Sequence, residues 1–155
     1  MKIFGNRKIT IFHKVMIILG FVILFGTTVF VALNYSYLPE QIPNHFDVFG
    51  NADSYSSKSG ILFPVILSWL LYVGLVIVSF IPKIWNVPKG WSAAPLRSML
   101  LFLALFISAD LSYTVICQFR GKGLGVWYMP VFLTGCFVTI IVGMICSYRQ
   151  GKKEK

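Results

Sequence analysis

The sequence has little charge, and acidic side chains are especially scarce. Charged residues make up 12% of the 155 residues, and Asp and Glu together number 5. An ordinary soluble domain carries roughly 25% charged residues. A soluble fold of this length has too little interior to bury a composition that is 57% hydrophobic. The scarcity of charge therefore excludes an ordinary soluble domain and indicates a membrane protein.

Cysteines and catalytic motifs are also scarce. The 3 cysteines, Cys117, Cys136 and Cys146, lie within or at the ends of apolar windows and show no C-x-x-C spacing, so we expect packing residues. The sequence contains no P-loop, nucleophile elbow, kinase set or deaminase set, and no spacing of Ser, His and Asp defines a triad. These absences favour a protein that is not an enzyme.

Long hydrophobic windows occupy most of the chain. Each is close to the ~20 residues that a helix needs to cross ~30 Å of hydrocarbon. A backbone in lipid must satisfy its own hydrogen bonds, which favours helices. We therefore expect an all-α membrane protein, with residues 1–155 as a single integral membrane domain. The predicted four-helix transmembrane bundle has spans at about residues 15–34, 61–81, 96–118 and 126–147.

Basic residues gather on one side of the predicted spans. That side holds Lys2, Arg7, Lys8, Lys14, Lys83, Lys89, Arg97, Arg149, Lys152, Lys153 and Lys155, and the other side holds Lys58, Arg120 and Lys122. By the positive-inside rule both termini lie in the cytoplasm, and residues 35–59 lie outside. Topology and contacts with anionic lipid explain the basic residues, so we expect the lipid bilayer and no nucleic acid as a partner.

Leu38 to Lys58 form the longest segment without a hydrophobic run, and we expect residues 35–59 to be an ordered extracytoplasmic loop that caps the bundle. Pro39 and Pro43 favour an extended backbone around them. Residues 50–53, with the sequence GNAD, are typical of a turn. A loop of this length with apolar residues of its own is more typical of an ordered cap than of a floppy linker.

The cap carries a distinctive pattern, LP-x-x-IP-x-HF-x-x-x-G-x-x-D-x-x-x-x-K. Its residues are Leu38, Pro39, Ile42, Pro43, His45, Phe46, Gly50, Asp53 and Lys58. The pattern resembles the signature of DUF1648, an uncharacterised family of bacterial and archaeal membrane proteins. This resemblance implies a multi-pass protein of the bacterial cell (plasma) membrane in which the loop is important.

The same domain begins the SdpI-type immunity proteins, which protect a producing cell against its own secreted toxin. The resemblance therefore also implies an immunity-type role. It covers about the first half of the chain. Residues 82–155 lack the G-I-R-like turn and the later tryptophan motif that usually follow in SdpI-type proteins.

The strongest site candidates in the loop are His45, Asp47 and Asp53. An imidazole with carboxylates suits a divalent metal, although the spacing matches no H-E-x-x-H motif. A structural interpretation is also open. In it Asp53 closes a turn, Lys58 pairs with a carboxylate, and His45 forms a hydrogen bond with a carbonyl. A third reading is direct binding of a peptide, a lipid or a protein partner. No other cofactor is expected.

Asp110 is the acidic residue inside a predicted span. An ionised carboxylate at that depth costs at least ~2.5–3.5 kcal/mol on insertion scales, so it should face the bundle interior and have a partner or a proton. Thr114 lies one turn further along the same face. Arg120 and Lys122, beyond the end of the span, are placed to snorkel towards it. Asp110 is thus a hydrogen-bonded packing residue, a proton or ion site, or a carboxylate locally exposed to lipid or water.

Small residues recur at every fourth position of the last predicted span, at Gly135, Thr139, Gly143 and Ser147. Small residues on one face let helices approach closely in lipid. The neighbour is either another span of the same chain or a second copy, which would make a homodimer.

These features define three competing functions. The first is a small, non-catalytic membrane protein that binds a peptide or a membrane-protein partner through its outer loop. The second is a small transporter or proton-coupled element centred on Asp110. The third is a membrane enzyme that uses His45 and the loop carboxylates.

Overall fold

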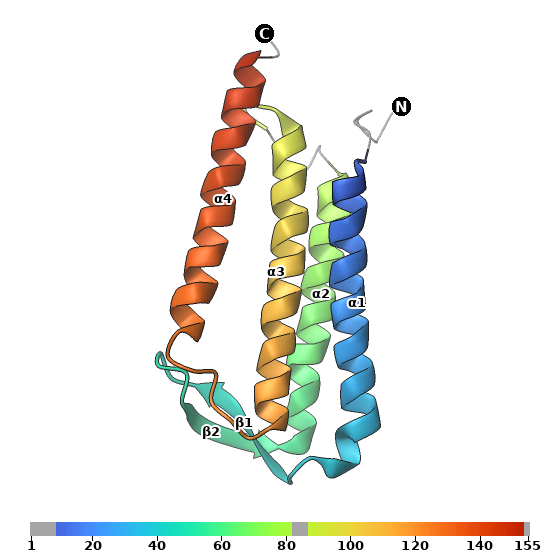
Figure 1. The fold of residues 1–155 in the computed structure, drawn as a ribbon, viewed down its shortest axis with the longest axis vertical. Coiled ribbons are helices and arrows are strands. Elements are labelled where there is room, and N and C mark those ends of the chain that lie inside the picture. Colours follow the sequence, from blue (N-terminus) through green and yellow to red (C-terminus); the bar gives the residue numbers. More distant parts are fainter. Residues whose placement is uncertain (1–8, 82–86, 154–155) are drawn as a thin grey trace.

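The computed structural model describes residues 9–81 and 87–153, and in this part of the chain it has four α-helices (Figure 1). They are α1 (Ile11–Asn34), α2 (Leu62–Phe80), α3 (Ala93–Phe119) and α4 (Tyr128–Lys153). Each is long and apolar enough to cross a membrane, which confirms the helical part of the prediction. Of the basic residues assigned to the cytoplasmic side, Lys2, Arg7, Lys8, Lys83 and Lys155 lie outside the described residues.

Helix α1 begins earlier than predicted because a capping box starts it. The hydroxyl of Thr10 accepts a hydrogen bond from the backbone N–H of His13 at 3.3 Å, and the His13 ring accepts from the Thr10 backbone N–H. A histidine thus takes the place that Glu or Gln usually holds in this motif. His13 is buried and also lies 2.9 Å from the Ser98 hydroxyl of α3. His13 therefore caps the first turn of α1 and joins it to α3.

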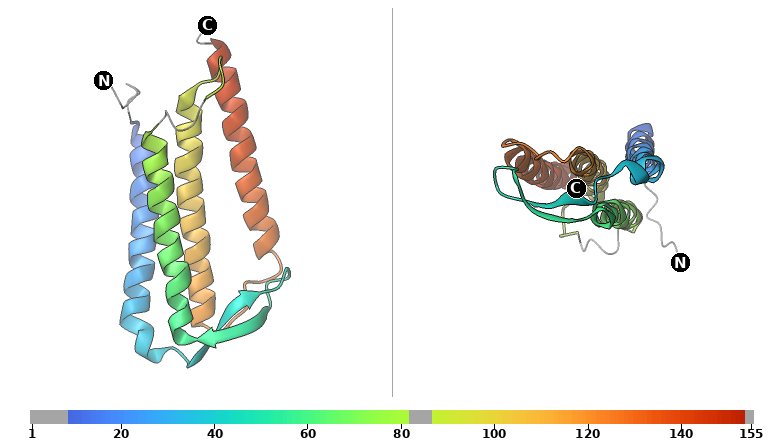
Figure 2. Two further views of the ribbon diagram at one scale, coloured as in Figure 1. Left: turned by 180° about the vertical axis from the view of Figure 1, so that it is seen from behind. Right: turned by 90° about the horizontal axis from the view of Figure 1, so that it is seen from below.

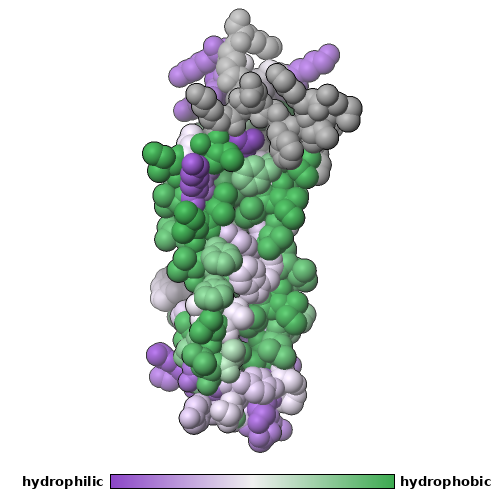
Figure 3. Space-filling view, turned by 90° about the vertical axis from the view of Figure 1, so that its right-hand side faces the viewer, coloured by the Kyte–Doolittle hydropathy of each residue, from purple (hydrophilic) through white to green (hydrophobic). Residues whose placement is uncertain are grey.

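Helix α3 is the central helix, because it packs against α1, α2 and α4. Its buried side chains include Leu101, Ala104 and Val115. Helix α4 leans away from α1 and α2 and lies beside α3 (Figure 2). On the face shown in Figure 3, hydrophobic side chains make up most of the middle, and hydrophilic ones gather towards the two ends. This distribution is what a helix bundle in a hydrocarbon layer requires.

The small-residue face of α4 is used within the chain. A side chain at Gly135 would collide with the ring of Phe106, and one at Gly143 would collide with Met99. Near the end of α4, the Ser147 hydroxyl donates to the Ser92 carbonyl at 2.7 Å. This face therefore packs on α3 of the same chain, which is the first of the two neighbours that the sequence allowed.

The loop between α1 and α2 contains a β-hairpin, so the all-helical expectation was incomplete. Strands β1 (Gln41–Phe46) and β2 (Ala52–Ser57) pair antiparallel, with Gln41 opposite Ser57 and Phe46 opposite Ala52. The extended segment after Pro39 was predicted, but its pairing was not. The short 3-10 helices Tyr35–Tyr37 and Lys58–Ile61 connect the hairpin to α1 and α2.

The hairpin lies across one end of the bundle, and α1 begins and α4 ends at the opposite end (Figure 1). Its root is held by apolar burial. Ile42 is fully buried, and Leu38 is 5% exposed. Both belong to one cluster with Val31 of α1, Val65 of α2 and Val115 of α3. The root of the hairpin therefore shares the core of the bundle.

The tip of the hairpin is held differently, through backbone contacts with the loop between α3 and α4. Gly50 has a φ of +79°, and its carbonyl accepts a hydrogen bond from the Leu124 N–H at 2.7 Å. A Cβ at Gly50 would collide with the backbone of Gly125, and one at Gly123 would collide with Gly50. The absence of side chains at Gly50 and Gly123 thus permits the close approach of the two backbones.

Candidate functional site

His45 and Asp53 form a close pair on the surface of the hairpin. His45 Nδ1 lies 2.6 Å from Asp53 Oδ1, and the two side chains are 70% and 45% exposed. Adjacent ends of β1 and β2 supply them, and an irregularity in the strand register around His45 brings Asp53 within reach. An exposed pair of this kind adds little to stability. The pair is therefore accessible at the surface and contributes little to holding the hairpin.

Asp47, the third residue of the predicted metal set, serves the hairpin turn instead. Its carboxylate accepts hydrogen bonds from the backbone N–H groups of Phe49 at 2.9 Å and Asn51 at 2.8 Å, and from the Asn51 amide at 3.1 Å. The Asn51 side-chain amide is the largest of the influences that hold the pKa of Asp47 below its usual value. Asp47, and not Asp53, is thus the residue that closes the turn.

The carboxylates and histidine of the hairpin do not meet at one point. Within residues 9–81 and 87–153, no group of three His, Cys, Asp or Glu side chains is arranged to hold a metal ion. His45 and Asp53 alone offer a metal fewer ligands than protein sites normally supply.

Lys58 has a structural role at the base of β2. Its ammonium lies 2.9 Å from the Glu40 carboxylate, and its backbone N–H donates to the Glu40 carbonyl at 3.1 Å. The ammonium also lies 5.9 Å from the centre of the Tyr35 ring. The expected pairing of Lys58 with a carboxylate is therefore present, and it joins the two ends of the hairpin.

The remaining surface of the hairpin carries exposed apolar and aromatic side chains. Val48 is 69% exposed, Phe49 61% and Tyr55 57%. Pro39 is exposed and Phe46 is half-buried, so these two signature residues do not belong to the buried root. We call His45, Val48, Phe49, Asp53 and Tyr55 the hairpin face. It combines a polar pair with apolar surface, as binding surfaces often do.

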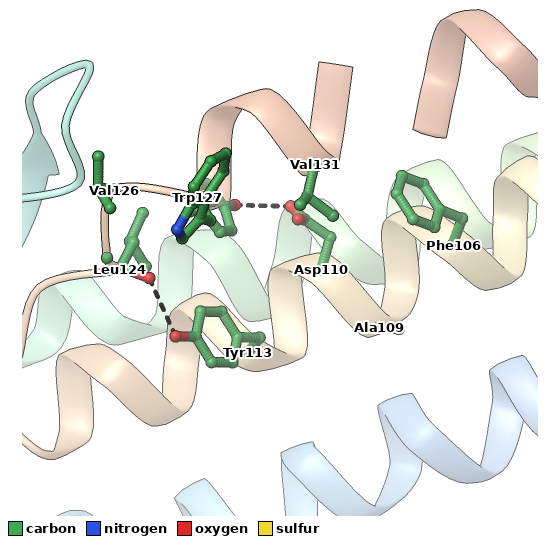
Figure 4. A pocket seen from close by; sticks show the side chains of 10 residues that line it. Phe106, Ala109, Asp110, Tyr113, Leu124, Val126, Trp127 and Val131 are labelled. Carbon is green, nitrogen blue, oxygen red and sulfur yellow. Dashed lines mark hydrogen bonds between the residues drawn. The ribbon is translucent and has the colours of Figure 1, made fainter. Parts of the chain in front are cut away.

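Asp110 has a partner that the sequence analysis missed. The hydroxyl of Tyr128, in the first turn of α4, donates to Asp110 Oδ2 at 2.7 Å (Figure 4). The Thr114 hydroxyl lies 3.0 Å from the Tyr128 hydroxyl and donates to the Asp110 backbone carbonyl at 3.2 Å. The predicted proximity of Asp110 and Thr114 is thus present.

Arg120 and Lys122 do not reach Asp110. In the part of the chain that the structure describes, Asp110 makes no ion pair. No pattern in the sequence pairs Tyr128 with Asp110, because the two residues lie in different helices.

Asp110 and Tyr128 lie in a cavity of about 580 Å³ between α3 and α4. Its lining includes the aromatic rings of Phe106, Tyr113, Trp127 and Tyr128 (Figure 4). The Tyr113 hydroxyl donates to the Leu124 carbonyl at 3.0 Å, which fixes the loop that also contacts the hairpin tip. We call this cavity the Asp110 pocket.

Helices long and apolar enough to span a membrane, with hydrophilic surface gathered at the two ends, define the class: a multi-pass membrane protein. Within that class, residues 22–68 match the family model described as a domain of unknown function (DUF1648). The match runs from α1 through the hairpin into α2 and confirms the family resemblance of this segment. No curated protein and no solved structure matches the chain.

Proposed function

We propose that this protein is a non-catalytic binding protein of a bacterial plasma membrane, with both termini in the cytoplasm and the hairpin outside. The basic residues at the ends of the chain support this orientation through the positive-inside rule. The hairpin then projects into the extracytoplasmic space, where it binds a peptide or a membrane-protein partner.

One observation carries the proposal: the hairpin is fixed to the bundle at root and tip, yet its face is left exposed. Burial of Ile42 and the contact of Gly50 with residues 123–125 account for the fixation. His45, Asp53 and Tyr55 contribute to neither. A rigid surface binds with a smaller loss of conformational entropy than a mobile loop.

The geometry favours an extended peptide as the partner. In the described residues the sheet has two strands, and β2 has mostly exposed side chains. A strand without a neighbour on its outer side offers backbone N–H and C=O groups to an added strand. His45, Asp53 and Tyr55 would then give side-chain specificity.

Site-specific photocrosslinking in living cells tests this proposal. Benzoylphenylalanine in place of Tyr55 should form an adduct of discrete mass, and the added change His45→Ala should weaken it. The matched control places the same group at Leu70, which is 67% exposed on α2. Identical adducts from both positions, or none at Tyr55, would contradict the proposal.

An immunity-type role is the finer form of the proposal. A strain lacking the protein should be more sensitive than its parent to at least one membrane-active peptide. The wild-type gene should restore resistance, and the double variant His45→Ala, Tyr55→Ala should not, at equal protein levels in the membrane. Unchanged sensitivity to every peptide tested would exclude immunity without excluding another partner.

A second candidate function is a small transporter or proton-coupled element. The observation that favours it is the Asp110 carboxylate, which has no ion-pair partner among the described residues. Such intramembrane carboxylates commonly mark ion or proton pathways. Liposomes containing the wild type should dissipate an imposed proton gradient faster than liposomes containing Asp110→Asn, and equal rates would exclude this function. An enzyme based on His45 and the loop carboxylates has no comparable support.

A further inference from the structure

The Asp110 pocket has the dimensions of a small-molecule site. Its volume of about 580 Å³ falls within the range of roughly 300–1,000 Å³ that is common for ligand pockets. It opens to the surface past Val126, Trp127 and Val131, which are 56%, 74% and 59% exposed. A ligand can therefore enter from the lipid or from the membrane interface without movement of the hairpin root.

The pocket contains a single acidic group in apolar surroundings. Asp110 Oδ2 accepts from Tyr128, and the structure gives Oδ1 no hydrogen bond within residues 9–81 and 87–153. An ionised carboxylate in this environment is costly unless a positive charge compensates it. The described part of the chain places no such charge beside Asp110, so a cationic occupant would compensate the ionised form, where otherwise a bound proton does.

The rings around Asp110 restrict the chemistry of that positive charge. Phe106, Tyr113, Trp127 and Tyr128 present aromatic surface, and aromatic rings attract organic cations that shed water easily. A Mg²⁺ or Ca²⁺ ion needs several oxygen ligands in addition to one carboxylate. The lining therefore suits a cation with apolar substituents and disfavours a bare metal ion.

We propose that the Asp110 pocket binds a lipophilic organic monocation, such as a quaternary ammonium or phosphonium compound. Asp110 compensates the charge, Tyr128 orients the carboxylate, and Trp127 lies against the substituents at the mouth of the pocket. The proposal concerns binding alone. It stands whether or not the protein moves protons, and it is independent of any partner of the hairpin face.

Equilibrium dialysis of radiolabelled tetraphenylphosphonium tests the proposal on the full chain in micelles of a nonionic detergent. The wild type should bind the probe saturably, and Asp110→Asn should weaken binding about tenfold or more, because the charge is lost while the side-chain shape is kept. The matched control is Glu40→Gln, the same chemical change at an exposed carboxylate of the hairpin. It should leave binding unchanged.

A second variant guards against misfolding of Asp110→Asn. Trp127 is 74% exposed, so Trp127→Leu should fold normally while weakening binding about threefold to tenfold through loss of the ring. The uncharged analogue triphenylphosphine oxide should not displace the probe. Wild-type affinity in both variants, or displacement by the neutral analogue as effective as by unlabelled probe, would overturn the proposal.

Discussion

The root and the tip of the hairpin are fixed to the same bundle by opposite means. At the root, side-chain packing holds the hairpin, because Leu38 and Ile42 are buried among residues of α1, α2 and α3. At the tip, backbone contacts hold the hairpin, because Gly50 lies against the backbone of the loop between α3 and α4. The side chains of Val48 and Phe49 are consequently not needed to hold the tip, and they are exposed. A segment can thus be held rigidly while its side chains remain available for binding.

The largest effect should come from adding one carbon at the tip. Gly50→Ala introduces a Cβ at a φ of +79° and against the Gly125 backbone, so we expect a loss of about 2–5 kcal/mol in the free energy of unfolding. Denaturant unfolding in detergent micelles measures it.

The matched control for this substitution is Gly121→Ala. Gly121 has a φ of +61° but open space around its Cβ position, so backbone strain alone should cost about 1–2 kcal/mol. If Gly50→Ala costs no more than Gly121→Ala, the backbone contact at the tip is not what holds the hairpin.

Removing one carbon at the root should have a smaller effect. Ile42→Val leaves a small gap in the buried cluster and should cost about 0.5–1.5 kcal/mol by the same unfolding measurement. Val48→Ala at the exposed tip should change stability by less than about 0.5 kcal/mol. Equal costs at the two positions would remove the distinction between a packed root and an exposed tip.

The smallest effect should be the pH dependence of the stability that Asp47 contributes. Because the folded-state pKa of Asp47 is lowered, its ionised form stabilises the turn fully above the unfolded-state pKa of about 3.9. This stabilisation is lost as the pH falls through the folded-state pKa. The stability advantage of the wild type over Asp47→Asn should therefore shrink on acidification below about pH 4.

Unfolding midpoints of the two proteins, compared across that pH range, measure this difference. The comparison cancels the contributions of all groups that the two proteins share. A difference that stays constant with pH would show that the Asp47 carboxylate does not hold the turn through its charge.

The helices were predictable because hydrophobic windows of membrane length have few alternatives. Their starts were less so: the cap at Thr10 depends on a histidine in an unusual place. The pairing of β1 with β2 was missed because β2, with the sequence ADSYSS, lacks the alternation of apolar and polar residues that marks a strand. Proline stiffness indicated only that the first half of the loop is extended.

The sequence identified most residues of the candidate sites, but it did not show which of them contact one another. The sequence shows that His45, Asp47 and Asp53 share one loop. In the structure Asp47 accepts hydrogen bonds within the turn, whereas His45 and Asp53 pair with each other. The same limit applies to Tyr128, because no local pattern tells which residue of another helix will face Asp110. Close approach of two backbones, as at Gly50 and Gly125, is a tertiary property that glycine content alone cannot reveal.

Helix α4 meets the rest of the chain through Tyr128 at its beginning and Ser147 near its end. An α-helix turns through about 100° per residue, so an insertion or deletion of one residue between these positions would rotate one contact out of alignment with α3. The two contacts therefore fix both the rotation of α4 about its own axis and the number of residues between them. Substitutions on its outward side should be tolerated over evolutionary time, whereas changes in the number of residues between the two contacts should not.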